Sequence, residues 1–197
     1  VDSANDAARS HSVCFRARAI AHGLTVGRVI SPAYSGEPTC EIVWGKNPDE
    51  NWPPHARAVR KMLKDGGKLI VIDPRVTPLA GKAHIHARVR PGTDCALALG
   101  LMQVMISEGL YDRDFVADWT VGFDRLAEHV KAYPPERVAD ITRVPAEMIR
   151  NMARMYAANK PGVITTGIAL DHSTNGVQTL RAVAIMVAIS GNLDVQG

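Results

Sequence analysis

Three short segments of the sequence carry side chains that suit the binding of a nucleotide, and each follows an apolar run. They are residues 44–48 (WGKNP), 73–77 (DPRVT) and 90–94 (RPGTD). Each combines a Gly or Pro turn with Asn, Asp, Arg or Thr side chains, which hydrogen-bond to purine edges, ribose hydroxyls or phosphates. Turns after strands favour the same residue types. Because the pattern recurs at three successive places, we interpret it as a nucleotide site rather than as three independent turns.

Four apolar segments predict the sheet from which these residues project. Residues 41–45, 68–73 and 162–167 are short continuous apolar runs, as is typical of parallel strands that are covered on both faces. Residues 82–90 alternate between basic and apolar side chains, which indicates a half-covered strand near the sheet edge. Ligands of open α/β sheets bind beyond the carboxyl ends of the strands. We therefore expect the three polar segments to share one edge of one sheet.

Helical segments fill the intervals between the predicted strands. Residues 53–65 repeat apolar residues every three to four positions and stop at two glycines, so that with their flanking strands they predict a right-handed βαβ unit. Residues 94–108 predict a long helix that Thr93 or Asp94 caps. Residues 175–190 are apolar on nearly every side, which predicts a buried helix. The fold class that follows is α/β, with a short parallel sheet between helical layers.

The composition excludes several classes of protein. With 46% hydrophobic residues and a net charge of +3, the 197-residue chain is not of the disordered type. The longest apolar stretch is far shorter than the ~20 residues that span a bilayer, so we expect no membrane insertion. Lys and Arg barely outnumber Asp and Glu, 23 to 20, which does not suit a nucleic-acid-binding surface. Cys14, Cys40 and Cys95 form no CxxC pair, so neither a disulfide framework nor a self-contained zinc or iron–sulfur site is expected.

Both ends of the sequence look cut rather than finished. Val1 stands in place of Met, no signal-peptide pattern follows it, and the sequence stops directly after an apolar helix. There is no internal repeat and no low-complexity linker. We therefore expect residues 1–197 to be a single α/β domain from a longer multidomain polypeptide.

Five motifs taken together resemble one family. WGKNP, IDPRVT, RPGTDCAL, LYDRDFVADWTVGF and SGNLD occur in this order, and the combination resembles the molybdopterin oxidoreductases of the dimethyl-sulfoxide-reductase type. The resemblance covers essentially the whole chain and is strongest over residues 44–123. It implies a Rossmann-like three-layer αβα domain with a short, mostly parallel sheet. In this family that is the third domain of a large enzyme, which carries Mo or W on two molybdopterin guanine dinucleotides.

The resemblance also implies which residues contact the dinucleotide. The 44–48 loop matches the stretch nearest the pterin and diphosphate, and the 73–77 loop matches residues near the guanosine. Asp94 matches an aspartate that is expected to accept both N–H donors of the guanine edge. Late in the chain, Ile168 and His172 occupy places where the family often has Met-Gly and Gln. The implied cofactor contacts are Trp44, Gly45, Lys46, Asn47, Pro48, Asp73, Arg75, Thr77, Gly92, Thr93, Asp94, Ile168 and His172.

Cys14 is the residue that the resemblance implies as a metal ligand. It stands in SVCFRARA, ahead of GLTVG, which is similar to the Cys-x-x-Pro-Arg-x-x-Ala…Thr-x-Gly pattern of the cysteine-ligated branch, with Ala17 in place of proline. A soft thiolate suits Mo or W, and the start of a helix favours a thiolate. Cys14 would therefore be the catalytic residue of this domain. The alternative is a buried structural cysteine, the role that we expect for Cys40 and Cys95.

The implied function is two-electron oxidoreduction by the full-length protein. Electrons would leave through a [4Fe–4S] cluster outside this chain, and the expected partners are the remaining domains of the polypeptide and an iron–sulfur electron-transfer subunit. One alternative is a hydratase of the acetylene-hydratase type, in which the metal is a Lewis acid. Another is a non-catalytic nucleotide-binding or structural module. Of the other candidates, His22 and His55 are expected on helices without a partner, and His84 and His86 on a solvated or domain-covered strand face.

Overall fold

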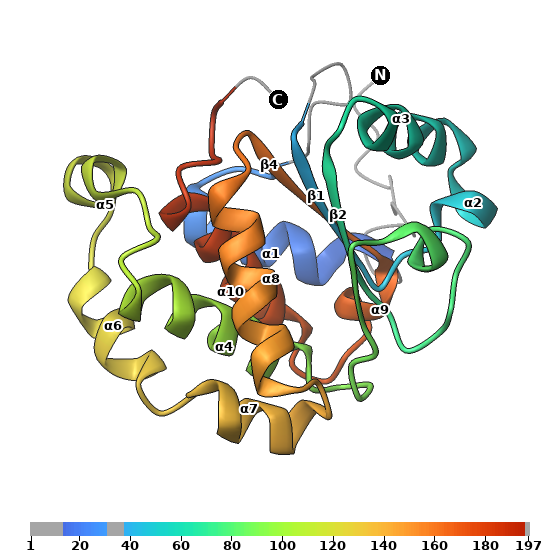
Figure 1. Cartoon of the computed structure of the whole chain (residues 1–197). Coiled ribbons are helices and arrows are strands. Elements are labelled where there is room, and N and C mark those ends of the chain that lie inside the picture. The colour runs from blue at the N-terminus through green and yellow to red at the C-terminus, as the bar shows by residue number, and fades with distance from the viewer. Residues whose placement is uncertain (1–13, 31–37, 196–197) are drawn as a thin grey trace, which may run out of the picture.

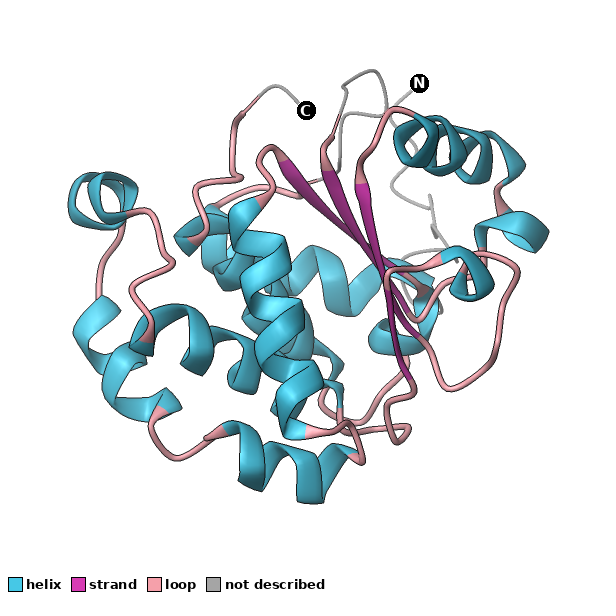
Figure 2. Ribbon diagram, in the orientation of Figure 1, coloured by secondary structure: helices cyan, strands magenta, loops and turns pink. Residues whose placement is uncertain are grey.

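The computed structural model describes residues 14–30 and 38–195. In these ranges, the strands β1 (Cys40–Trp44), β2 (Lys68–Ile72), β3 (Ile85–Ala87) and β4 (Gly162–Thr166) form one parallel sheet in the order β3-β2-β1-β4 (Figure 2). The predicted α/β fold, its strands and the edge position of the alternating segment are confirmed. The alternating segment is paired over only three residues, because the 3-10 helix η2 (Ala80–Lys82) takes up its beginning.

Helices cover both faces of the sheet (Figure 1). Successive strand residues point to opposite sides, and the strands are apolar at nearly every position, so both faces need covering. Val43 and Val71 face the helix α3 (Pro53–Lys64) and η2 in a small apolar cluster. Ile42 and Ile70 face a larger core built by the helices α1 (Arg16–Val26), α4 (Asp94–Ser107), α8 (Ala146–Ala158) and α10 (Gly176–Ile189). The remaining helices are α2 (Pro48–Asn51), α5 (Arg113–Trp119), α6 (Phe123–Val130), α7 (Pro135–Thr142) and α9 (Ile168–Asp171).

The start of α4 differs from the prediction that Thr93 or Asp94 caps it. Thr93 is the N-cap residue, but its hydroxyl donates to the carbonyl oxygen of Arg90 at 2.6 Å. Oδ1 of Asp94 accepts instead from Nε1 of Trp44 at 2.8 Å. The predicted side-chain cap is therefore wrong, because a turn and a strand each engage one of the two side chains.

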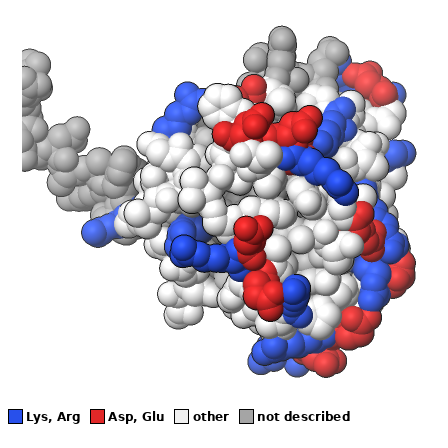
Figure 3. All heavy atoms as spheres, turned by 90° about the vertical axis from the view of Figure 1, so that its left-hand side faces the viewer, with Lys and Arg blue, Asp and Glu red and all other residues white. Residues whose placement is uncertain are grey.

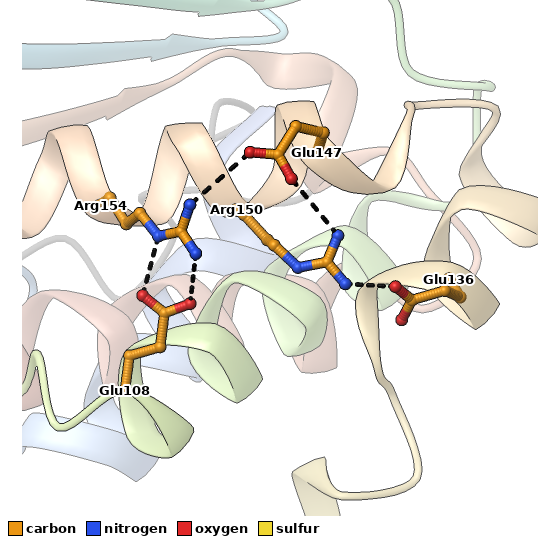
Figure 4. Close-up of polar contacts among 5 residues, drawn as sticks. All are labelled: Glu108, Glu136, Glu147, Arg150 and Arg154. Carbon is orange, nitrogen blue, oxygen red and sulfur yellow. Dashed lines mark hydrogen bonds and ion pairs between the residues drawn. The ribbon is translucent and has the colours of Figure 1, made fainter.

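A network of ion pairs fastens α8 to its neighbours (Figure 4). Arg154 holds Glu108, the C-cap residue of α4, through two hydrogen bonds, of 2.8 and 2.9 Å, and this contact lowers the pKa of Glu108. Arg150 pairs with Glu136 of α7, and both arginines lie near Glu147 of α8. Figure 3, which views the molecule from the side where α5 lies in Figure 1, shows acidic and basic side chains interspersed. Exposed pairs of this kind contribute little individually, so the core supplies most of the stability.

No helix in the described ranges is both long enough and apolar enough to cross a membrane.

Candidate functional site

The polar segments that follow the strands meet at the carboxyl edge of the sheet. Backbone hydrogen bonds join them: Gly45 N–H donates to the carbonyl oxygen of Ile72 at 2.7 Å, and Gly167 N–H donates to that of Trp44 at 2.8 Å. Asp73 N–H donates to the carbonyl oxygen of Ala87 at 3.2 Å. The strand order therefore places the loops after β2, β1 and β4 side by side. Figure 1 shows α9 at the same edge, next to the start of α1.

Trp44 and Asp94 connect the end of β1 to the start of α4. Trp44 is fully buried, and its indole N–H is held by one carboxylate oxygen of Asp94. The other oxygen, Oδ2, accepts no hydrogen bond from the described residues, and a carboxylate has room for about four. Asp94 can therefore hold the tryptophan and still receive donors from a ligand. The two residues are 50 positions apart, and no sequence pattern marks the pair.

In the loop after β2, two buried side chains hydrogen-bond to the loop backbone and one side chain is largely exposed to solvent. Oδ1 of the buried Asp73 accepts from the backbone N–H of Arg75 at 2.8 Å, and the hydroxyl of the buried Thr77 accepts from Ala80 N–H at 3.1 Å. The Arg75 side chain is 64% exposed. Asp73 and Thr77 therefore shape the loop, whereas Arg75, whose Nε lies 3.5 Å from Oδ1 of Asp73, leaves most of its side chain exposed.

The two strand histidines, expected on a solvated or domain-covered face, also make contacts to the backbone. Nε2 of His86 lies 2.9 Å from the carbonyl oxygen of Asp73, and Nδ1 of His84 accepts from Leu69 N–H at 3.2 Å. Both side chains reach back to backbone groups of the neighbouring β2 segment. His84 is exposed and His86 is half-buried, so the predicted face is the outer one. The two side chains add links across the sheet edge, where β3 pairs over only three residues.

The loops after β1 and β4 touch through their backbones. Gly45 has a φ of +58°, and a Cβ on Gly167 would lie 1.8 Å from the carbonyl oxygen of Gly45. Next to this contact, Asn47 is only 4% exposed, and its buried Oδ1 has no hydrogen-bond partner among the described residues. An unsatisfied buried acceptor costs about 1–3 kcal/mol. The loop is therefore built to receive a hydroxyl or N–H donor from outside itself.

We expect Gly167→Ala to disrupt this edge. The new methyl group has no space beside Gly45, so the two loops must separate, at a cost of at least about 1–3 kcal/mol in the free energy of unfolding. Denaturant unfolding of the full-length protein measures this loss. Gly81→Ala is the matched control, because a Cβ there meets no atom within 4 Å. Equal stability of the two variants would contradict the predicted clash.

A cavity of about 570 Å³ opens beside β4 and is lined by residues of several elements. Nζ of Lys46 lies 4.6 Å from the centre of the Trp52 ring. Burial together with nearby Arg18 lowers the pKa of Lys46, although Glu41 opposes this shift.

His22 also lines the cavity. Burial, reinforced by Arg18, lowers the pKa of His22 to about 4. Nδ1 of His22 accepts from Ile30 N–H at 3.2 Å, so the expectation of a histidine without a partner is wrong.

We expect His22 to make the fold acid-sensitive in one pH window. Its folded pKa of about 4 lies below the usual value of 6.5, so the unfolded chain binds the proton more readily. This contribution to stability is complete above pH 6.5 and is lost as the pH falls toward 4. The variant His22→Gln should flatten the pH dependence of Tm in that window. An unchanged dependence would exclude His22 as its source.

Glu41, the second residue of β1, is buried and has partners that the sequence interpretation did not identify. Oε1 of Glu41 accepts from Nε2 of His55 at 2.7 Å and from the hydroxyl of Thr165 at 2.8 Å, and all three residues are buried. The expectation that His55 has no partner is therefore wrong. A glutamate inside an apolar strand was the available signal, because a buried charge requires partners. The contact fixes the start of α3 next to Trp52, whose ring centre lies 5.6 Å from that of His55.

The other predicted contacts lie around the same edge. Gly92 has a φ of +82°, in the turn before α4. Ile168 begins α9 and His172 is the C-cap residue that follows it, and both residues are exposed. Pro48 begins α2 and is buried. The structure thus brings these positions to the sheet edge, while their roles toward a cofactor stay predictions.

Cys14 is exposed and lies, with Phe15, in the π-helical turn that leads into α1. The alternative of a buried structural cysteine is therefore wrong for Cys14. Cys40 is buried, as expected, whereas Cys95 is half-buried, and burial raises the pKa of both thiols. Within the described ranges, no group of three or more His, Cys, Asp or Glu residues is arranged to hold a metal ion.

Comparison with known proteins gives consistent matches. The family model described as "Molybdopterin oxidoreductase" matches residues 37–197. Acetylene hydratase of Syntrophotalea acetylenica is 41% identical over 172 residues, which are 85% of this chain and 24% of that protein. Formate dehydrogenase H of Escherichia coli (strain K12) is 39% identical over 152 residues, 77% of this chain and 21% of that protein. The solved structure of acetylene hydratase from Pelobacter acetylenicus superimposes with a TM-score of 0.90 at 37% identity, over 95% of this chain and 26% of that one. The chain thus spans about a quarter of these relatives.

Proposed function

We propose a function for this chain on one premise: it belongs to the molybdopterin oxidoreductase family. Membership of this family implies a molybdopterin cofactor with Mo or W. We propose that the chain holds the guanosine half of one molybdopterin guanine dinucleotide at the carboxyl edge of its sheet. Its second role is to present Cys14 as a ligand to the metal. The full-length protein would then be a two-electron oxidoreductase with two such dinucleotides.

The observation that carries the proposal is the set of polar groups along one sheet edge. Asp94 has a carboxylate oxygen available for the guanine N–H groups, and Arg75 presents an exposed guanidinium to the anionic part of the ligand. Asn47 supplies a buried acceptor that lacks a donor. These groups lie at or beside successive strand ends, as an extended dinucleotide requires. Their donor and acceptor types fit a guanine, a phosphate and a hydroxyl or pterin N–H.

Cys14 is suited to ligation by its exposure and by its thiol. The sulfur can be reached by a group held outside this chain, because Cys14 is exposed. A thiolate is also the soft type of ligand that Mo and W accept. When bound, the pterin-held metal supplies the redox chemistry, whereas the residues of this chain bind and orient that group. The proposed electron path runs through a [4Fe–4S] cluster outside this chain, to an iron–sulfur subunit.

A hydratase is the second candidate, because the sequence and structure comparisons both include an acetylene hydratase. In that case the full-length protein would add water to its substrate without net electron transfer. The residues at the sheet edge and Cys14 would keep the same binding roles. A non-catalytic module is not favoured, because the relatives named above are enzymes. Assays of the full-length protein with a redox dye and with an alkyne separate the two candidates.

The proposed function is tested first by the composition of the full-length protein. After expression in a host that makes the cofactor, we expect one Mo or W per polypeptide. Acid hydrolysis should release two guanines for each metal. A preparation without either metal would contradict the proposal, and metal without guanine would contradict the dinucleotide form.

A further inference from the structure

The start of α1 is capped by a residue from the other end of the chain. The N-cap residue Phe15 makes no side-chain cap, and the first turn contains no acidic residue. Helix starts leave backbone N–H groups that need acceptors. Oδ1 of Asp171, which is 153 residues away, accepts from the backbone N–H of Arg18 at 3.1 Å. The carboxylate thus supplies the cap that the local sequence lacks.

The side chain of Arg18 makes the same connection. Its Nη2 donates to Oδ2 of Asp171 at 2.6 Å, and to the carbonyl oxygens of Thr166 and Gly167 at 3.2 and 3.4 Å. The Asp171 side chain is 2% exposed and that of Arg18 is 20% exposed. The Phe15 ring lies against the guanidinium, 5.5 Å from its carbon to the ring centre. Both the backbone and the side chain of Arg18 are therefore fixed to the segment that runs from the end of β4 to the end of α9.

This connection joins Cys14 to the proposed cofactor loops. Cys14 lies four residues before Arg18, and Gly167 is hydrogen-bonded to Trp44, directly before the 45–48 loop. We propose that Arg18 and Asp171 form a clamp that positions the Cys14 thiolate toward the metal. This inference rests on the proposed role of Cys14 as a ligand. Because the arginine neutralises the carboxylate, the clamp adds no net charge beside the thiolate.

The clamp is separable from the general packing of α1. Ala21, one turn after Arg18, is fully buried in the core that α1 shares with α10. Losing the clamp should therefore release the first turn of α1 while the rest of the helix stays in place. Arg18 and Asp171 are accordingly positioning residues, and their effect should appear at Cys14 before it appears in the fold.

The test uses the full-length enzyme and the variants Asp171→Ala and Asp171→Asn. The readouts are guanine and metal content, the number of sulfur neighbours in X-ray absorption, and the rate at which iodoacetamide alkylates Cys14, identified by peptide mass. For Asp171→Ala we expect unchanged guanine, a looser sulfur shell and alkylation of Cys14 faster by about tenfold or more. Asp171→Asn keeps an acceptor for the Arg18 N–H but loses the ion pair, so its rate should be intermediate. If the Asp171→Ala protein does not accumulate in the host, the Asp171→Asn variant alone tests the proposal.

Asp112→Ala is the matched control. Asp112 caps α5 by accepting from Phe115 N–H at 2.9 Å, so its loss removes a helix cap away from Cys14. This variant should lose stability without faster alkylation. If the Asp171 variants behave like it, the clamp is wrong, while ligation by Cys14 stands as long as Cys14→Ser removes a sulfur neighbour. If Cys14→Ser leaves the sulfur count unchanged, the proposed ligand role fails and the clamp fails with it.

Discussion

Asp94→Asn is expected to deplete the full-length enzyme of one of its two guanines while leaving its fold close to that of the wild type. The amide oxygen of asparagine can still accept from the indole N–H of Trp44, now held by Oδ1 of Asp94 at 2.8 Å. It cannot accept both guanine N–H groups at once, as a carboxylate does. Each buried donor left without an acceptor costs about 1–3 kcal/mol. We therefore expect the occupancy of this one dinucleotide to fall tenfold or more, so that the guanine released by acid hydrolysis falls from two toward one per polypeptide.

Two further variants separate recognition of guanine from support of the fold. Asp94→Ala removes both functions, so it should lose guanine and also destabilise the protein, because the buried indole N–H loses its acceptor. Trp44→Phe removes only the indole N–H and leaves the carboxylate, so it should lower stability and keep guanine. If Asp94→Asn retained full guanine while Asp94→Ala unfolded more easily, Asp94 would serve Trp44 alone.

The elements could be predicted because local patterns determine them. The runs that became β1, β2 and β4 are apolar throughout and end at turn residues, and the predicted boundaries agree with the structure to within one residue. β3 was predicted too long, because alternation marks which side chains share a face but not which backbone groups find partners. Lys82 lies in η2, and Val89 N–H bonds to Ala87 within its own segment.

The contacts that organise the site could not be predicted in the same way. The polar segments were expected at one sheet edge, because parallel strands all end on the same side. Their pairings depend on side chains far apart in the sequence: Trp44 with Asp94, and Arg18 with Asp171. No periodicity marks such pairs. Each polar residue has several acceptors within reach once the chain folds, and packing decides which one it uses.

Cys14→Ser is expected to remove one sulfur neighbour from the metal and to lower turnover at least about a hundredfold. Losing a residue that only supports a metal ligand costs about 10–100-fold, and loss of the ligand itself should cost no less than the upper end of that range. Guanine and metal content should stay close to wild type, because the pterin dithiolenes also hold the metal in the proposed arrangement. X-ray absorption at the Mo or W edge counts the sulfur neighbours. Cys40→Ala is the control, because it removes a thiol from the buried start of β1.

The control separates loss of a ligand from loss of a packed thiol. Cys40→Ala should lower stability, because it leaves a cavity in the core, and the sulfur count at the metal should not change. Cys14 is exposed, so Cys14→Ser should have little effect on unfolding and its main effect at the metal. An unchanged sulfur count with normal turnover would exclude Cys14 as the ligand and contradict the proposed likeness to the cysteine-ligated branch. Cys14→Ser and Cys40→Ala, which each remove one cysteine sulfur from the protein, would then differ only in their effect on stability.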